Sequence, residues 1–189
     1  MEASHFVANA LPENTGYTWT LTSRLGSIIR EVEALYGERD KSWTILGVEF
    51  GPGIPMLWYP GDCMHVAIQL SANALESTSI ASYQLAHEAV HLLSPTGGNE
   101  APVLEEGIAT VFSEDYMLRN FHLRGLTDLV SYRNAAALVR ELETISPSAI
   151  VRLRRVEPSF AKMTVATFTE AAVDAPQNLI NDLLSPFVR

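Results

Sequence analysis

The sequence predicts an α+β fold, with a short sheet near the N-terminus and a mostly helical C-terminal half. Residues 43–70 contain runs of β-branched and aromatic residues, separated by turn-forming Gly and Pro, which is typical of strands. Apolar residues recur every three or four positions in residues 20–36 and again from residue 80 onward, as in amphipathic helices. We therefore expect strands first and then helices.

Composition indicates an ordinary globular protein. The 189 residues are 47% hydrophobic and 19% charged, which predicts a single domain spanning residues 1–189. The net charge of −9 disfavours nucleic acid and anionic membranes as partners. The basic run at residues 152–155 is expected to be a solvated helix face. No secretion signal or long apolar segment is evident, so we expect a cytoplasmic protein, or a secreted one if a signal peptide was removed. Nothing indicates an oligomeric state.

The N-terminal half can be divided by its turn signals. Residues 1–17 are rich in Asn, Pro and Gly and predict a leader or strap without regular structure. A helix follows at residues 20–36 and is ended by Gly37. Strands are expected at residues 43–50, 54–59 and 64–70, with Gly and Pro between them.

Helices dominate the rest of the chain. Residues 80–93 form one, with cap candidates at residues 77–79 and a break at residues 94–98. The next begins near Asn99, with Pro102 in its first turn, and runs to about Arg119. Further helices are expected at residues 126–144, at 149–156, and at 170–184 with an interruption near Pro176.

The most specific motif is His87-Glu88-Ala89-Val90-His91, which has the pattern H-E-x-x-H. In a helix, His87 and His91 lie one turn apart on the same face, so both imidazoles can reach one ion while Glu88 lies at the edge of that face. The most apolar arc of this helix lies on the opposite side, which suits a helix that lines a cleft. A pair of hydrogen-bonded core histidines without any metal is the structural alternative.

At this motif the chain resembles the zincin metallopeptidases. A second stretch, Glu105-Glu106-Gly107-Ile108-Ala109, is similar to the E-G-x-A helix of some gluzincins. The resemblance implies a small zincin-like domain in which His87, His91 and Glu106 bind Zn²⁺ and Glu88 acts as general base on a zinc-bound water. Thr110 or Ser113 would be placed to hydrogen-bond a ligand.

Two assignments stay open at this point. Glu105 borders the apolar face of its helix and is a rival to Glu106 as third ligand. Zincins also use a Tyr, His or Arg to stabilise the developing oxyanion, and the residues that qualify by position are Tyr116, His122, Tyr132 and Arg133.

The leading hypothesis is hydrolysis of a peptide or protein substrate by a zinc metallopeptidase. The resemblance implies that the strand at residues 64–70 forms the sheet edge that lines the cleft, where an extended substrate would pair with it; an interior strand is the alternative. The alternative is a zinc-binding regulatory or interaction domain that keeps a zincin frame without general peptidase activity.

Overall fold

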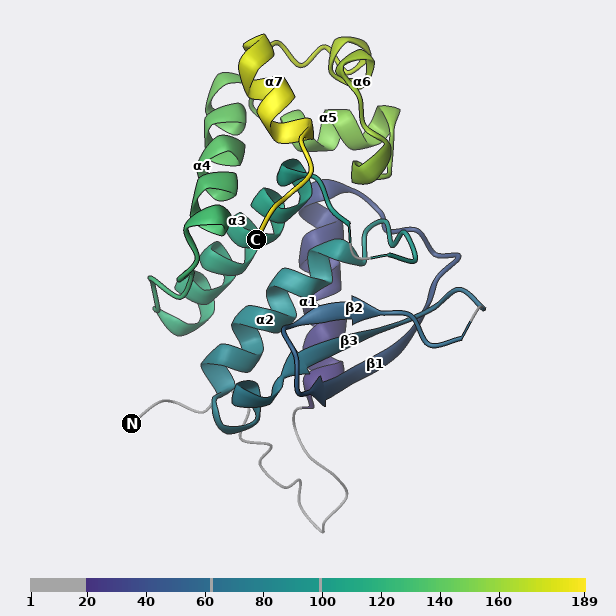
Figure 1. Cartoon of the computed structure of the whole chain (residues 1–189), viewed down its shortest axis with the longest axis vertical. Helices are drawn as coiled ribbons and strands as arrows, with labels where there is room; N and C mark the ends of the chain where they lie inside the picture. Colours follow the sequence, from purple (N-terminus) through teal and green to yellow (C-terminus); the bar gives the residue numbers. More distant parts are fainter. Residues whose placement is uncertain (1–19, 62, 99) are drawn as a thin grey trace.

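The computed structural model describes residues 20–61, 63–98 and 100–189, and it has the expected α+β organisation. The sheet lies at one end of the molecule and helices α5 to α7 lie at the other (Figure 1). Its strands are β1 (Thr44–Gly51), β2 (Met56–Trp58) and β3 (His65–Ser71). The helices are α1 (Leu21–Tyr36), α2 (Thr78–His91), α3 (Val103–Phe121), α4 (Val130–Ile145), α5 (Ala149–Val156), α6 (Val165–Glu170) and α7 (Gln177–Leu184). The expected leader at residues 1–17 and the helix start at Asn99 fall outside the described residues.

The strand order corrects one prediction. The order is β1-β3-β2, with β3 parallel to β1 and antiparallel to β2, so residues 64–70 form the centre of the sheet and not its edge. Val66, Ala67 and Ile68 are buried in succession, which is typical of a strand covered on both faces. The two edge strands are β1 and β2, and no strand within the described residues pairs with the outer side of β2.

Helices α2 and α3 pack against each other next to this sheet (Figure 1). Helix α2 begins at Ser77, whose Oγ accepts a hydrogen bond from the backbone N–H of Ile80 at 3.3 Å. Its predicted core face, which includes Leu85 and Ala89, is buried, but the side that carries His87 is largely buried as well. Helix α2 therefore lies between two layers, with its histidines facing α3.

Helix α4 packs closely against α3, at the position of Gly107. A Cβ atom at Gly107 would lie 2.5 Å from the carbonyl oxygen of Ala135 and 2.6 Å from a methyl group of Val139. Only glycine permits this approach without displacing the backbone of α4. The glycine that follows Glu106 thus has a packing role in addition to its place in the motif.

Three predictions for the C-terminal half need adjustment. The helix expected at 126–144 begins only at Val130. Of the helix expected at 170–184 with an interruption near Pro176, only the part after Pro176 forms, as α7. Helix α6, which follows a capping box at Thr164 and ends at Glu170, was not expected. In the basic run, Arg154 is buried and donates hydrogen bonds to the carbonyl oxygens of Tyr36 and Gly37, both at 2.9 Å.

Most buried apolar side chains of the described residues form one hydrophobic cluster, to which the sheet and helices α1 to α7 all contribute. Among the described helices, none has the length and apolar character needed to span a membrane. The single domain, the cytoplasmic location and the expected lack of nucleic-acid and membrane partners stay predictions.

Candidate metal centre

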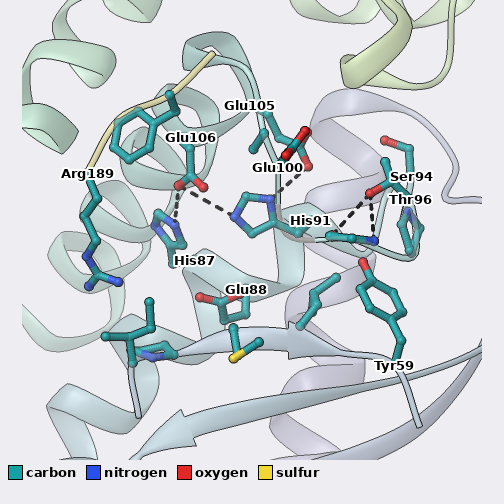
Figure 2. A pocket seen from close by; sticks show the side chains of 18 of the residues that line it. Tyr59, His87, Glu88, His91, Ser94, Thr96, Glu100, Glu105, Glu106 and Arg189 are labelled. Atoms are coloured by element: carbon teal, nitrogen blue, oxygen red, sulfur yellow. Dashed lines mark hydrogen bonds and ion pairs between the residues drawn. The ribbon is translucent and has the colours of Figure 1, made fainter. Parts of the chain in front are cut away.

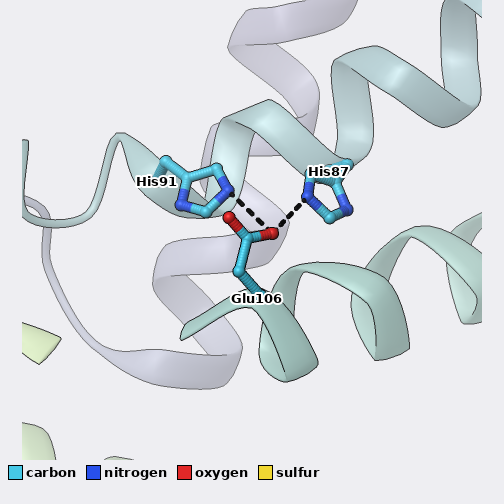
Figure 3. A group of neighbouring side chains, drawn as sticks. All are labelled: His87, His91 and Glu106. Carbon is cyan, nitrogen blue, oxygen red and sulfur yellow. Dashed lines mark hydrogen bonds and ion pairs between the residues drawn. The ribbon is translucent and has the colours of Figure 1, made fainter. Parts of the chain in front are cut away.

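Three side chains from two helices meet at one point. His87 and His91 extend from α2, and Glu106 extends from the first turn of α3 toward both rings (Figure 3). Oε2 of Glu106 lies 3.1 Å from Nε2 of His87 and 3.8 Å from Nε2 of His91. One ligand atom from each residue lies within 4.8 Å of the others, so the group can hold a metal ion.

Two of the three spacings within the triad fit a small tetrahedral ion. Ligand bonds of roughly 2.0–2.1 Å place neighbouring ligand atoms about 3.4 Å apart. The two distances from Glu106, 3.1 and 3.8 Å, lie on either side of that value. Two imidazoles and one carboxylate also match the donor types that Zn²⁺ accepts at sites with an open position. The residues present therefore fit a metal ion of this kind.

Glu105 contacts the same site from the outer side. Nδ1–H of His91 donates a hydrogen bond to Oε1 of Glu105 across 2.8 Å, so His91 lies between two carboxylates. A carboxylate on the second nitrogen fixes the orientation of a ligating histidine and increases its basicity. Glu105 is 4% exposed and therefore belongs to the site, but as a partner of His91 and not as a member of the triad.

The charges explain how the triad is held together in the metal-free protein. Burial lowers the pKa of His91, but Glu106 and Glu105 outweigh burial and raise this pKa to about 10. Burial raises the pKa of Glu106, whereas His91 and His87 outweigh it and lower that pKa to about 2. His91 and Glu106 are thus an ion pair at neutral pH, and a metal that binds here replaces the proton on His91.

Glu88 is a different kind of carboxylate. It is 5% exposed, lines the cavity beside the triad, and makes no hydrogen bond or ion pair with another described residue. Burial raises its pKa, and the nearby His91 and His87 only partly offset that effect. The predicted general base is therefore placed beside the triad with its carboxylate unengaged.

The triad opens into a cavity of about 260 Å³ (Figure 2). One wall is formed by residues 54–57 and Tyr59, from β2 and its flanks. Another is formed by residues 94–96 and Gly98, in the break after α2. Tyr132 contacts the ring of His87, and Arg189 lies on the same side of the cavity (Figure 2). The cavity therefore runs along the unpaired edge of the sheet, as a site for an extended ligand would.

Of the four candidates for oxyanion stabilisation, the structure brings only Tyr132 to the cavity. Its ring meets that of His87 edge-on at 5.5 Å between centroids. Tyr116 is buried and accepts a hydrogen bond from Arg24 at 3.0 Å. His122 ends α3 in a left-handed conformation, and Arg133 donates to backbone carbonyls in the loop before α4.

The expectation for Thr110 and Ser113 is wrong. Their hydroxyls donate to the backbone carbonyls of Glu106 and Thr110, at 2.7 and 2.9 Å, and not to a ligand side chain. Both residues are fully buried, so their small size serves the packing of α3. Back-bonding to a carbonyl one turn earlier is common for Ser and Thr within helices.

Sequence reasoning missed two contributors to the cavity. Phe187 and Arg189 lie about a hundred residues after the motif and carry no local signal that connects them with it. The segment reaches the site because the backbone N–H of Phe187 donates to the carbonyl of Ala101 at 2.9 Å, just before α3. Such a contact can only be found from the three-dimensional structure.

Comparisons with known proteins give no further guide. No family model matches the chain, and neither a curated protein nor a solved structure matches it. The function is therefore argued from the site itself.

Proposed function

We propose that this chain is a zinc-dependent peptidase of the gluzincin type, with Zn²⁺ held by His87, His91 and Glu106. The observation that supports it most is the meeting of these three ligand groups beside a buried, unengaged Glu88. When bound, Zn²⁺ supplies polarisation of the scissile carbonyl and of the attacking water. Peptide hydrolysis needs an electrophile such as this metal ion, a general base and a substrate-binding surface, and the cavity offers a candidate for each.

Glu88 is the proposed base. A carboxylate with a raised pKa is a better proton acceptor near neutral pH than an exposed glutamate, because its basicity is closer to the operating pH. Glu88 takes the proton of the attacking water and delivers it to the leaving amine. Its lack of hydrogen-bonding partners among the described residues leaves both oxygens available for this transfer.

Tyr132 is the proposed oxyanion donor. Burial raises its pKa to about 12, and Glu106 adds to the shift, so the phenol stays protonated over the working pH range. A neutral phenol can donate a hydrogen bond to the carbonyl oxygen as negative charge develops on it. Replacement by phenylalanine should lower kcat by about 10- to 1000-fold with unchanged metal content. Full activity in Tyr132→Phe would remove Tyr132 from the mechanism.

The outer edge of β2 is the proposed substrate platform. Its backbone groups have no strand partner among the described residues, and the strand and its flanks line the cavity. An extended peptide can add to such an edge by main-chain hydrogen bonds, which places one of its carbonyls beside the triad.

The role of Glu88 is tested by Glu88→Gln. The amide keeps the size of the side chain but cannot accept the proton, so cleavage of an unstructured casein substrate should fall about 100- to 10,000-fold while zinc content is unchanged. Wild-type activity in this variant would refute the mechanism. Zinc binding by the wild type without cleavage of any unstructured substrate would favour the regulatory alternative.

The ligand assignment is tested by zinc stoichiometry in protein purified without a His-tag. Glu106→Gln should lose zinc, because an amide is a much poorer ligand than a carboxylate. Glu105→Gln should keep a full equivalent at saturating zinc, since its carboxylate only supports His91. The opposite result would exchange the roles of the two glutamates.

A further inference from the structure

A second cavity of about 360 Å³ adjoins the triad on the side opposite residues 94–98. Residues that line both cavities include His87, Glu88, Tyr132 and Arg189. The two cavities therefore form one cleft that passes the triad, and Arg189 stands at the point where they meet.

Arg189 is placed there by a defined set of contacts. The backbone N–H of Val103 donates to the carbonyl of Ser185 at 2.9 Å, and a similar bond anchors Phe187. The ring of Phe187 lies 4.8 Å from that of Tyr132, and the guanidinium of Arg189 lies over the Tyr132 ring, 5.6 Å from its centroid. The guanidinium is thus held beside His87 by its contact with one ring of a tilted aromatic pair (Figure 2).

The charge around this guanidinium is otherwise acidic. Among the described residues that line either cavity, Arg189 is the only arginine or lysine, whereas the lining includes Glu88, Glu106 and Asp128. No carboxylate in the described part of the chain forms an ion pair with Arg189. Its charge favours the ionised forms of Glu88 and Glu106, but neither carboxylate forms an ion pair with it. The planar guanidinium therefore keeps donors that can bind a carboxylate through two parallel hydrogen bonds.

We propose that Arg189 selects peptide substrates that carry a carboxylate next to the scissile bond, on the side of the second cavity. This proposal rests on the proposed peptidase function and names the substrate class of the same site. The carboxylate can come from a Glu or Asp side chain or from a free C-terminus, and both offer the same two oxygens to the guanidinium. Without Arg189, the acidic residues that line the cleft would repel an anionic substrate.

The test measures binding and cleavage separately. Binding is measured with the zinc-loaded Glu88→Gln protein and fluorescein-labelled decapeptides that differ only by Glu or Gln at one position, each made with a free and with an amidated C-terminus. At one position, or for the free C-terminus, the anionic peptide should bind about 10- to 100-fold more tightly than its neutral counterpart. The comparison of Glu with Gln tests a side-chain carboxylate, and the comparison of free with amidated C-termini tests the terminal carboxylate.

Arg189 is then replaced in the same background. Arg189→Ala should abolish the preference for the anionic peptide, and Arg189→Lys should retain part of it because the charge remains without the fork. Arg155→Ala removes an exposed cation outside both cavities and should leave the preference unchanged. Zinc content should be the same in all of these variants.

Several outcomes would overturn the proposal. It is wrong if no peptide shows a carboxylate preference, if no peptide binds, or if Arg189→Ala keeps the preference. Cleavage of these decapeptides by the wild type without any preference for Glu over Gln, or for a free over an amidated C-terminus, would refute the role of Arg189 and leave the peptidase proposal intact. An Arg189-dependent preference in binding, with no cleavage by the wild type, would refute the peptidase proposal instead.

Discussion

The proton on His91 allows a quantitative prediction for the metal-free protein. Two carboxylates hold this imidazole and raise its pKa to about 10, whereas an exposed histidine titrates near 6.5. At pH 7 the ring is then three pH units below its midpoint, and at about 1.4 kcal/mol per unit the removal of its proton costs about 4 kcal/mol. Zinc binding displaces this proton, so the apparent zinc affinity should rise about tenfold per pH unit between pH 7 and 8.5.

The assay is an NMR titration of the imidazole C–H signals in the metal-free protein. His91 should titrate near pH 10, and the zinc affinity should be measured over the same pH range by competition with a chelator. Glu105→Gln removes the charged acceptor at 2.8 Å and should lower the midpoint by about one to two units. A wild-type midpoint below 7, or a midpoint unchanged in Glu105→Gln, would refute the electrostatic account of the site.

Three further predictions concern stability. Gly107→Ala places a Cβ atom 2.5 Å from a backbone carbonyl of α4 and should lower the free energy of unfolding by about 1–3 kcal/mol in urea titrations; an unchanged midpoint would contradict the close packing. Arg154→Met leaves several buried carbonyls without their hydrogen-bond donor and should lower the free energy of unfolding by about 2–4 kcal/mol in the same assay. A decrease below about 0.5 kcal/mol, which is typical of a surface substitution, would argue against this role of Arg154. In the metal-free protein, the stabilisation from the pair of His91 and Glu106 should be complete between about pH 4.5 and 6.5, fall toward pH 2 as Glu106 is protonated, and fall toward pH 10 as His91 loses its proton. Glu106→Gln should flatten this pH profile of the unfolding free energy, and an unchanged profile would contradict the pairing.

Local patterns in the sequence predict many of the secondary-structure elements. The sequence predicts a helix at residues 149–156, and α5 has the same bounds, with Pro147 and Ser148 before it and Glu157 and Pro158 after it. The meeting of His87, His91 and Glu106 was also predictable. Both histidines lie on one face of a single helix, and the resemblance to the gluzincin E-G-x-A helix favours Glu106 while it leaves Glu105 as a rival.

Other features depend on which elements become neighbours in space. Alternation in residues 64–70 indicates a strand but does not say whether it lies at the edge or in the centre, since that depends on where β2 pairs. Glu105 and Glu106 have the same chemistry and adjacent positions, so only the orientation of His91 separates their roles. Arg154 looks like part of a solvated basic run until the ends of α1 and α2 are brought to it.

The two parts of the cleft become available at different stages of chain synthesis. The triad is local, since its members span only residues 87–106 and come from consecutive helices. The wall beside His87 depends on Phe187 and Arg189, whose contacts with residues 101–132 close a long loop. Contacts of low sequence separation form before those that close long loops. A nascent chain can therefore assemble its metal ligands well before the wall that we propose to select the substrate.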